Sequence, residues 1–315
     1  MILSASRRTD IPAFYSEWLL NRLKAGYVLV PNPRNPLRYS HIKLSPQTVD
    51  CIVFWTKNPR ACVSKLDAIS AMGYPFYFQF TLTPYGNDVE ANLPGKEELL
   101  SAFLELSAIL GPDRVVWRYD PVIITSQMDV SYHARCFEKM AARLEGSTYR
   151  CIFSYLDFYA RLSNSLRQIG ALRIEEEDMY RIAKAFSKSA KRHGMELSSC
   201  CEPIDLSRFG ISHASCIDKH MIETLIGCEL RVKKDTGQRP GCGCMESVDI
   251  GSYDTCLHGC KYCYGIYSAD RARKNRKDHD PKSPVLYGSL PNDAIITERT
   301  LNSLKDGQMN FFDLI

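Results

Sequence analysis

The sequence predicts an α/β protein built on a parallel sheet, and three observations support this. Six apolar runs rich in β-branched and aromatic residues recur along the first two-thirds of the chain. A segment with helical periodicity follows each run, and a glycine falls where each of these helices should stop. Regular strand–helix alternation implies a parallel sheet covered by helices. Runs that are apolar almost throughout fit strands buried on both faces.

The expected strands cover residues 1–5, 51–55, 76–82, 115–119, 151–155 and 195–198. The expected helices begin near Pro12, Pro59, Lys96, Val130, Ile174 and Cys216. Pro12 and Pro59 suit a first helical turn, with Asp10 or Asn58 available as caps. The expected helix stops are Gly26, Gly73, Gly111, Gly146, Gly194 and Gly227, because glycine adopts the left-handed backbone that ends a helix. Residues 27–44 predict a hairpin around the turn PNPRNP.

Six strand–helix units fit either a partial (βα)6 TIM-like barrel or a doubly wound sheet. We favour the barrel because polar residues gather at the strand ends, as around one shared mouth. The expected organisation is a barrel over residues 1–230, a cysteine-rich loop packed on it over 231–268, and a basic segment with a tail over 269–315.

Composition is ordinary for a soluble globular protein, since the 315 residues are 45% hydrophobic and 24% charged. The formal net charge of +4 is too small to demand a polyanionic partner, although it permits one. The chain starts without an apolar run of signal-peptide length, and none of its segments approaches the length of a membrane span. We therefore expect a cytoplasmic protein without membrane contact, and a monomer.

In parallel barrels, ligands bind at the carboxyl ends of the strands. The cationic residues expected there are Arg7, Arg8, Lys57 and Arg118, which suit a carboxylate or phosphate. The acidic residues are Asp10, Asp120 and Glu202, which suit an amino group or ribose hydroxyls, and Gln79 and Thr81 add polar groups. The alternative is that strand ends are polar because they meet water.

Nine of the thirteen cysteines lie between Cys200 and Cys263, whereas Cys51, Cys62, Cys136 and Cys151 sit in apolar patterns typical of core residues. Cys256, Cys260 and Cys263 form a C-x3-C-x2-C array with Tyr262 before the last thiol. Three thiolates can bind three irons of a four-iron cluster and leave the fourth iron open. Zinc is the rival, with His258 inside the loop as a further ligand.

A second metal site would use the pair Cys242 and Cys244 together with Cys216 and either Cys200 or Cys201. Four thiolates from these places would complete a second iron–sulfur cluster or a zinc site. The alternative is that Cys216 and one of the Cys200/Cys201 pair are merely buried thiols.

The loop CLHGCKYCYG resembles the signature of the radical S-adenosylmethionine (SAM) superfamily. With SASRRTDIPA, VFWTKNP, WRYDP, SCIDK and the stretch CGCMESVDIGSYDTCLHGCKYCYG, nearly the whole chain resembles domain-of-unknown-function family 1848. A more distant similarity to spore photoproduct lyase-type enzymes rests on the CxxxCxYCY loop alone.

This resemblance implies a radical SAM-like partial barrel whose cysteine loop comes from the C-terminal end of the chain and folds over the mouth. It implies a 4Fe–4S cluster, SAM, and a reductant such as flavodoxin or ferredoxin. The enzyme would make a 5′-deoxyadenosyl radical that abstracts hydrogen from an anionic substrate, of which a nucleotide or nucleic acid fits best.

In this interpretation the residues that contact the cofactor are Tyr262, Arg7, Arg8, Asp10, Gln79 and Thr81. The residues that line the reaction site are Lys57, Arg118, Asp120 and Glu202. The chain lacks a GGE segment after the second strand, so Asp10, Asp120 or Glu202 must receive the SAM amino group. The alternative function is a DNA-associated repair or nuclease-like protein with structural zinc or iron–sulfur sites. Gln308–Phe312 resembles the short peptide with which bacterial repair and replication proteins dock on the sliding clamp. The alternative is a terminal segment packed on the domain.

Overall fold

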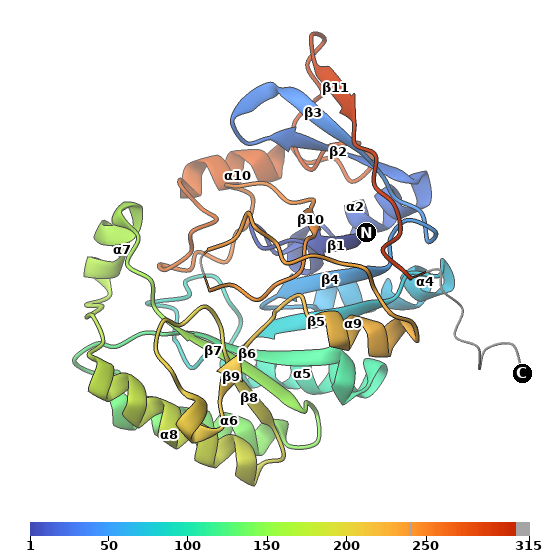
Figure 1. Cartoon of the computed structure of the whole chain (residues 1–315). Helices are drawn as coiled ribbons and strands as arrows, with labels where there is room; N and C mark the ends of the chain where they lie inside the picture. Colours follow the sequence, from blue (N-terminus) through green and yellow to red (C-terminus); the bar gives the residue numbers. More distant parts are fainter. Residues whose placement is uncertain (240, 307–315) are drawn as a thin grey trace, which may run out of the picture.

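The computed structural model describes residues 1–239 and 241–306, and an eight-stranded parallel sheet forms its centre (Figure 1). All six strands predicted from the sequence are present. They are β1 (Ile2–Ala5), β4 (Cys51–Thr56), β5 (Phe76–Thr81), β6 (Val115–Val122), β7 (Arg150–Tyr155) and β8 (Glu196–Ser199). The prediction of an α/β fold with a parallel sheet is therefore confirmed.

Two short strands extend the sheet at its edges and were not predicted. β9 (Ser212–His213) pairs with β8, and β10 (Val248–Asp249) pairs with β1 through Leu3↔Val248 and Ser4↔Asp249. A two-residue strand carries too little periodicity to be recognised in a sequence. The segment that contains β10 thus returns from the cysteine-rich region to the first strand, as the orange part of Figure 1 shows.

The strand order is β10-β1-β4-β5-β6-β7-β8-β9, so the six predicted strands follow one another without a reversal. A doubly wound sheet reverses its strand order at a switch point. The order observed here excludes that alternative. In the described residues β10 and β9 are not paired with each other, and the sheet is open rather than a closed barrel.

The predicted helices are present, the first two each divided into two helices, whereas the helices over 163–168 and 269–277 were not predicted. Their bounds are α1 (Ile11–Phe14), α2 (Ser16–Ala25), α3 (Arg60–Val63), α4 (Leu66–Ala71), α5 (Lys96–Leu110), α6 (Val130–Leu144), α7 (Ser163–Gln168), α8 (Glu176–Arg192), α9 (Lys219–Ile226) and α10 (Ala269–Lys277). α9 begins at Lys219 rather than near Cys216, because the Asp218 side chain accepts a hydrogen bond from Met221 N and caps the helix there. Gly26 ends α2 in the left-handed conformation, with φ of 76°.

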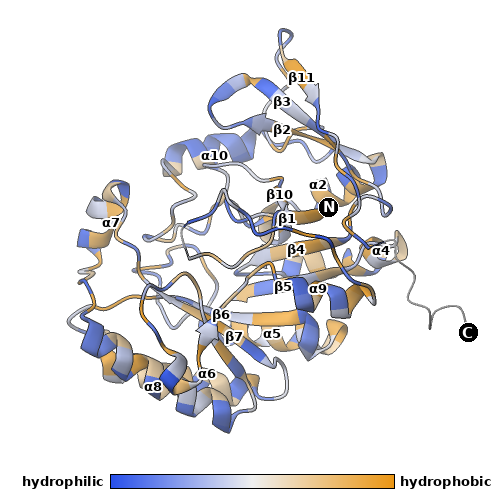
Figure 2. Ribbon diagram, in the orientation of Figure 1, coloured by the Kyte–Doolittle hydropathy of each residue, from blue (hydrophilic) through white to orange (hydrophobic). Residues whose placement is uncertain are grey.

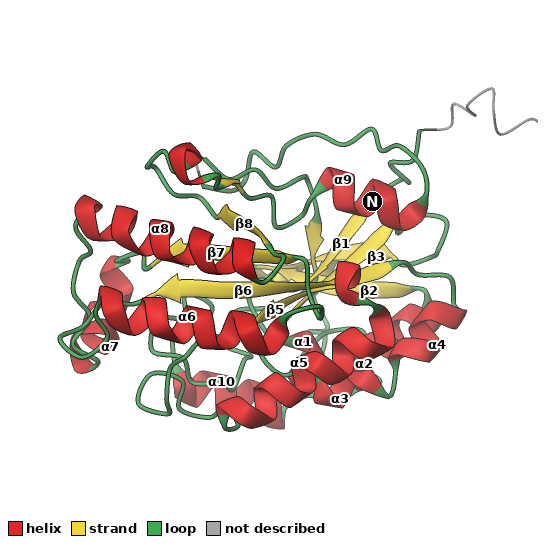
Figure 3. Cartoon of the chain, turned by 90° about the horizontal axis from the view of Figure 1, so that it is seen from below, coloured by secondary structure: helices red, strands yellow, loops and turns green. Residues whose placement is uncertain are grey.

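The two faces of the sheet are both buried, and alternate residues of each strand point to opposite sides. The larger apolar core lies between the sheet and the helices that run along one of its sides (Figures 2 and 3). The strands contribute Leu3, Phe54, Phe78, Trp117 and Phe153 to it. Their neighbours pack in a second core on the other side of the sheet, together with α9 and five buried cysteines. These neighbours are Ile2, Val53, Tyr77, Val116 and Ile152. This arrangement explains why the strands read as continuous apolar runs.

The predicted hairpin is formed by β2 (Tyr27–Asn32) and β3 (Asn35–Lys43), which build a separate sheet with β11 (Ile295–Glu298). Cys51, Cys62 and Cys151 are buried as predicted, whereas Cys136 on α6 is only half-buried, which corrects its assignment to the core. Of the described helices, none combines the length and apolarity needed to cross a bilayer. The clamp-like peptide Gln308–Phe312 lies outside the described residues.

His133, on α6, is fully buried between Tyr119 and the backbone of Ile123. Its Nδ1 lies 2.9 Å from Tyr119 Oη, and its Nε2 lies 2.8 Å from the Ile123 carbonyl oxygen. Burial lowers the pKa of His133 from 6.5 to about 4. The folded protein therefore favours the neutral imidazole, and this stabilisation is present above pH 6.5 and lost as the pH falls through 4.

We predict that the stability difference between the wild type and His133→Gln shrinks by up to about 3 kcal/mol as the pH is lowered from 7 to 4. Urea unfolding of both proteins at several pH values measures this difference. A difference that stays constant with pH would contradict the assignment.

Candidate functional site

A cavity of about 370 Å³ opens where the parallel strands end. Eight of the predicted cofactor and reaction-site residues line it: Arg7, Arg8, Asp10, Lys57, Thr81, Arg118, Asp120 and Tyr262. All seven predicted metal ligands line the cavity too, together with Cys201. They are Cys200, Cys216, Cys242, Cys244, Cys256, Cys260 and Cys263. Two predicted residues are not part of the lining. Gln79 lies behind it and donates from Nε2 to the Cys216 carbonyl oxygen at 2.8 Å, and Glu202 accepts a hydrogen bond from Tyr155 N.

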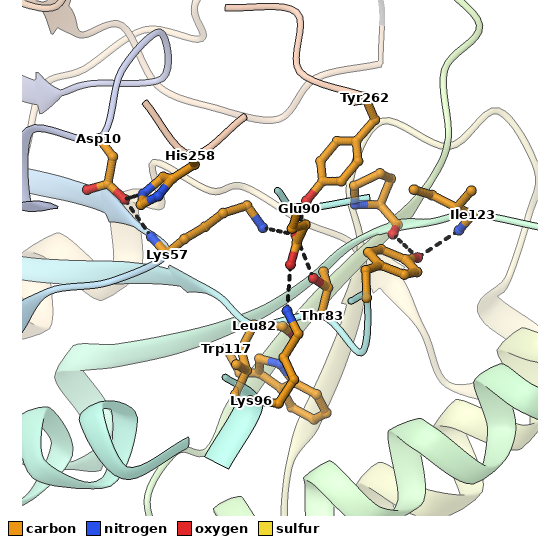
Figure 4. A network of polar contacts seen from close by, with 12 residues as sticks. Asp10, Lys57, Leu82, Thr83, Glu90, Lys96, Trp117, Ile123, His258 and Tyr262 are labelled. Atoms are coloured by element: carbon orange, nitrogen blue, oxygen red, sulfur yellow. Dashed lines mark hydrogen bonds and ion pairs between the residues drawn. The ribbon is translucent and has the colours of Figure 1, made fainter. Parts of the chain in front are cut away.

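The Asp10 carboxylate attaches the cysteine loop to the ends of β1 and β4. Its Oδ1 accepts a hydrogen bond from Ala13 N at 2.9 Å and so caps α1. Its Oδ2 lies 2.7 Å from Lys57 N and 2.7 Å from His258 Nε2 (Figure 4). The same oxygen lies 3.1 Å from Thr56 Oγ1. His258 belongs to the cysteine loop, and its side chain is almost completely buried against Asp10. Asp10 thus joins the turn after β1, the end of β4 and the loop.

Glu90 provides a second attachment, which the sequence did not reveal. This carboxylate is 1% exposed and accepts hydrogen bonds from Lys57 Nζ at 2.7 Å, Lys96 Nζ at 2.6 Å and Thr83 Oγ1 at 2.8 Å. The Tyr262 hydroxyl of the cysteine loop also donates to it (Figure 4). Burial alone would raise the pKa of Glu90, but the two lysines outweigh burial and lower it to about 2.

Backbone contacts fix the same loop. Lys261 N donates to the Val89 carbonyl oxygen at 2.9 Å, and Asn92 N donates to the His258 carbonyl oxygen at 3.0 Å. Gly265, at the end of the loop, passes close to the turn after β1, because a Cβ atom there would lie 2.6 Å from the Arg8 carbonyl oxygen. A glycine is therefore required at this contact.

The three thiols of the loop are half-buried and face the same cavity. Burial raises the pKa of Cys260 to about 12, although Lys57 nearby acts in the opposite direction. The Cys263 thiol accepts a hydrogen bond from Gly265 N at 3.3 Å. Within residues 1–239 and 241–306, no three His, Cys, Asp or Glu side chains already stand in an arrangement that could hold a metal ion.

Two guanidinium groups flank Trp55 at the end of β4. The Arg7 and Arg118 guanidinium carbons lie 5.1 Å and 5.2 Å from the Trp55 ring centroid. Arg118 also pairs with Asp120, which accepts a further hydrogen bond from Ser154 Oγ. Burial alone would raise the pKa of Asp120, but Arg118 and Ser154 lower it, so this carboxylate is ionised.

Several buried polar atoms around this cavity have no hydrogen-bond partner among the described residues. They are Arg7 Nη2, Thr9 Oγ1, Trp55 Nε1 and His258 Nδ1. Buried polar atoms are normally paired, and exceptions point to a ligand, an ion or water. A polar or charged ligand in the cavity would supply the missing partners.

Asp249 is another site residue that the sequence did not reveal. It belongs to β10 and accepts hydrogen bonds from Ser6 Oγ at 2.5 Å and from Arg7 N at 2.9 Å. It therefore shapes the turn that carries Arg7 and Arg8. Asp249 and Glu90 lie in segments without a strong periodic pattern, so their burial could not be read from the sequence.

The chain matches the family model described as a domain of unknown function (DUF1848) over residues 2–265. The chain belongs to this family. The match covers the sheet, the helices that surround it and the whole cysteine loop of the DUF1848 protein. No curated protein matches the chain significantly.

Glu90→Ala should destabilise the DUF1848 protein by about 3–5 kcal/mol, because it leaves two lysines in a buried site without their counter-charge. Glu97→Ala is the matched control, since Glu97 pairs with Arg143 on the exposed surface and should contribute less than about 1 kcal/mol. Urea unfolding measures both changes. Equal effects of the two substitutions would contradict the role given to Glu90.

Proposed function

We propose that this protein is a radical SAM-type iron–sulfur enzyme built on a partial (βα)6 barrel. The observation that carries the proposal is that the three thiols of the C-terminal loop line the cavity at the carboxyl ends of the strands. That edge is where parallel α/β folds bind ligands and carry out chemistry. The unreversed strand order and the open sheet agree with a partial barrel.

The donor set fits a cluster with one open iron. Cys256, Cys260 and Cys263 come from one short loop, and each contributes a soft thiolate of the kind that binds iron–sulfur clusters. His258 does not act as a fourth ligand through Nε2, because that nitrogen is hydrogen-bonded to Asp10. A closed zinc site would need His258 Nδ1, which has no partner among the described residues, as its fourth ligand, whereas three thiols suffice for a cluster with one open iron.

The residues around these thiols suit the parts of SAM. Asp120 is the predicted acid best placed for the amino group, because it is ionised and 24% exposed to the cavity. Asp10 lines the same cavity, but its oxygens already accept four hydrogen bonds from Ala13, Thr56, Lys57 and His258. Arg7 has an unpaired buried nitrogen that suits a carboxylate.

When bound and reduced, the cluster would supply the electron that cleaves SAM into methionine and a 5′-deoxyadenosyl radical. The protein's own contribution is to orient the reactants and to exclude water. Lys57 is held by Glu90 beneath the cavity, with its Nζ 5.5 Å from the Tyr262 ring centroid. Glu90 thus positions both a cation and the aromatic residue of the loop. The cationic lining favours an anionic substrate, for which a nucleotide or nucleic acid is our preferred class.

Cys260→Ala should abolish the formation of 5′-deoxyadenosine from SAM by anaerobic, reduced protein. Cys228→Ala is the control, because Cys228 is a half-buried thiol after α9 that does not line the cavity. Chromatographic detection of 5′-deoxyadenosine in single-turnover reactions measures the difference.

The proposal would be wrong if the reduced wild type, reconstituted with iron and sulfide, left SAM intact. It would also be wrong if Cys260→Ala and Cys228→Ala formed the product equally. A colourless wild type that holds only zinc and unfolds with chelator would instead favour the alternative of a structural metal in a DNA-associated protein.

A further inference from the structure

We propose that Cys200, Cys216, Cys242 and Cys244 form a second, closed metal centre in which all four ligands are thiolates. These residues follow β8, precede α9 and form the C-x-C pair of the cysteine-rich segment. All four are buried in the second apolar core, on the opposite side of the sheet from the large helices. The centre would be distinct from the three-cysteine loop, although both sets line one cavity.

The four thiols are close neighbours. Cys200 Sγ and Cys216 Sγ lie 3.5 Å apart, and the Cys244 thiol interacts with the thiols of Cys216 and Cys242. Two thiolates on one tetrahedral ion lie about 3.8 Å apart, given a zinc–sulfur distance of about 2.3 Å. The observed spacing of the first pair is close to that value. A bound metal ion would bring the Cys242 and Cys244 thiols into the same coordination shell.

Two guanidinium groups lie beside these thiols. Arg118 Nη1 points at Cys216 Sγ at 2.6 Å, in a site where Arg118 is 6% exposed. Arg7 lies near Cys244 and Cys216, and its buried Nη2 has no partner among the described residues. A buried cation needs a counter-charge. Four thiolates on a divalent ion carry two net negative charges, which would face Arg7 and also Arg118, whose other partner is Asp120.

Hydrogen bonds from neighbouring residues hold the ligands in place. Tyr77 Oη and Gln79 Nε2 both donate to the Cys216 carbonyl oxygen at 2.8 Å, and Ile217 N donates to Cys244 Sγ at 3.4 Å. Between the paired cysteines, a Cβ atom on Gly243 would lie 2.6 Å from Ser215 Oγ. Only glycine allows this close approach. Hydrogen bonds that orient the ligands in this way are characteristic of metal sites.

The test uses a variant that lacks the other three thiols, Cys256→Ala/Cys260→Ala/Cys263→Ala, purified without oxygen. We expect it to retain about one zinc, or about four irons with sulfide, per chain by elemental analysis. The two readouts distinguish zinc from an iron–sulfur cluster. Adding Cys216→Ser should lower the metal content at least tenfold. Adding Cys51→Ser should not, because Cys51 is a buried thiol of the same apolar core that lies outside the cavity lining.

A second measurement needs no substitution among the four proposed ligands. Chelator should lower the Tm of the triple variant, since a metal bound only by the folded state stabilises that state. A triple variant without metal would overturn the proposal. So would metal retained in full after Cys216→Ser, or a disulfide between Cys200 and Cys216 in anaerobic protein.

The two proposals fail separately. Wild-type protein that leaves SAM intact would contradict the radical SAM proposal, while metal in the triple variant would still support the second centre. Conversely, Cys242→Ser/Cys244→Ser protein with about four irons would show the first cluster without the second.

Discussion

The Asp10–His258 contact is the interaction on which the site depends. A carboxylate that is 6% exposed caps α1, holds the end of β4 and accepts a hydrogen bond from the cysteine loop, which is more than two hundred residues away in the sequence. A buried carboxylate must have its hydrogen-bonding capacity filled, and here the loop supplies one of the donors. Folding of the first strand turn and docking of the loop are therefore linked.

Glu90 holds the cysteine loop at a second point, because it binds both Tyr262 of the loop and Lys57 of the cavity. Its two lysines, one threonine and one tyrosine come from the ends of β4 and β5, from α5 and from the loop. Two fixed points leave the loop little freedom to move over the cavity. Positions held in this way suit chemistry that requires exact placement of reacting groups. The cysteine loop lies far from β1 in the sequence, but two buried carboxylates hold it at the edge where the parallel strands end.

The sequence predicted the central sheet and its helices well because strong local patterns specify these elements. The strands from Cys51 and Phe76 are continuous apolar runs, and glycines such as Gly26 mark the helix ends. It also predicted which strand ends carry polar residues, since parallel strands present those ends at one edge. The sequence did not decide between a partial barrel and a doubly wound sheet, because hydrophobic periodicity carries no information about strand order.

The sequence could not reveal contacts that depend on burial and on distant pairing. Glu90 looks like an ordinary loop residue, and only its position beside Lys57, Lys96 and Tyr262 gives it a role. The choice between Cys200 and Cys201 was likewise open. In the structure Cys200 Sγ faces Cys216, whereas Cys201 is half-buried and has a positive φ of 58°. Such distinctions arise only once distant segments pack together.

The most direct test of the docked loop is a crystal structure of anaerobically reconstituted protein, with anomalous diffraction recorded at the iron absorption edge. We predict an iron signal bound by Cys256, Cys260 and Cys263, inside the cavity that Lys57 and Asp120 line. Iron absent from these thiols, or a cysteine loop displaced from Asp10 and Glu90, would contradict the proposed function.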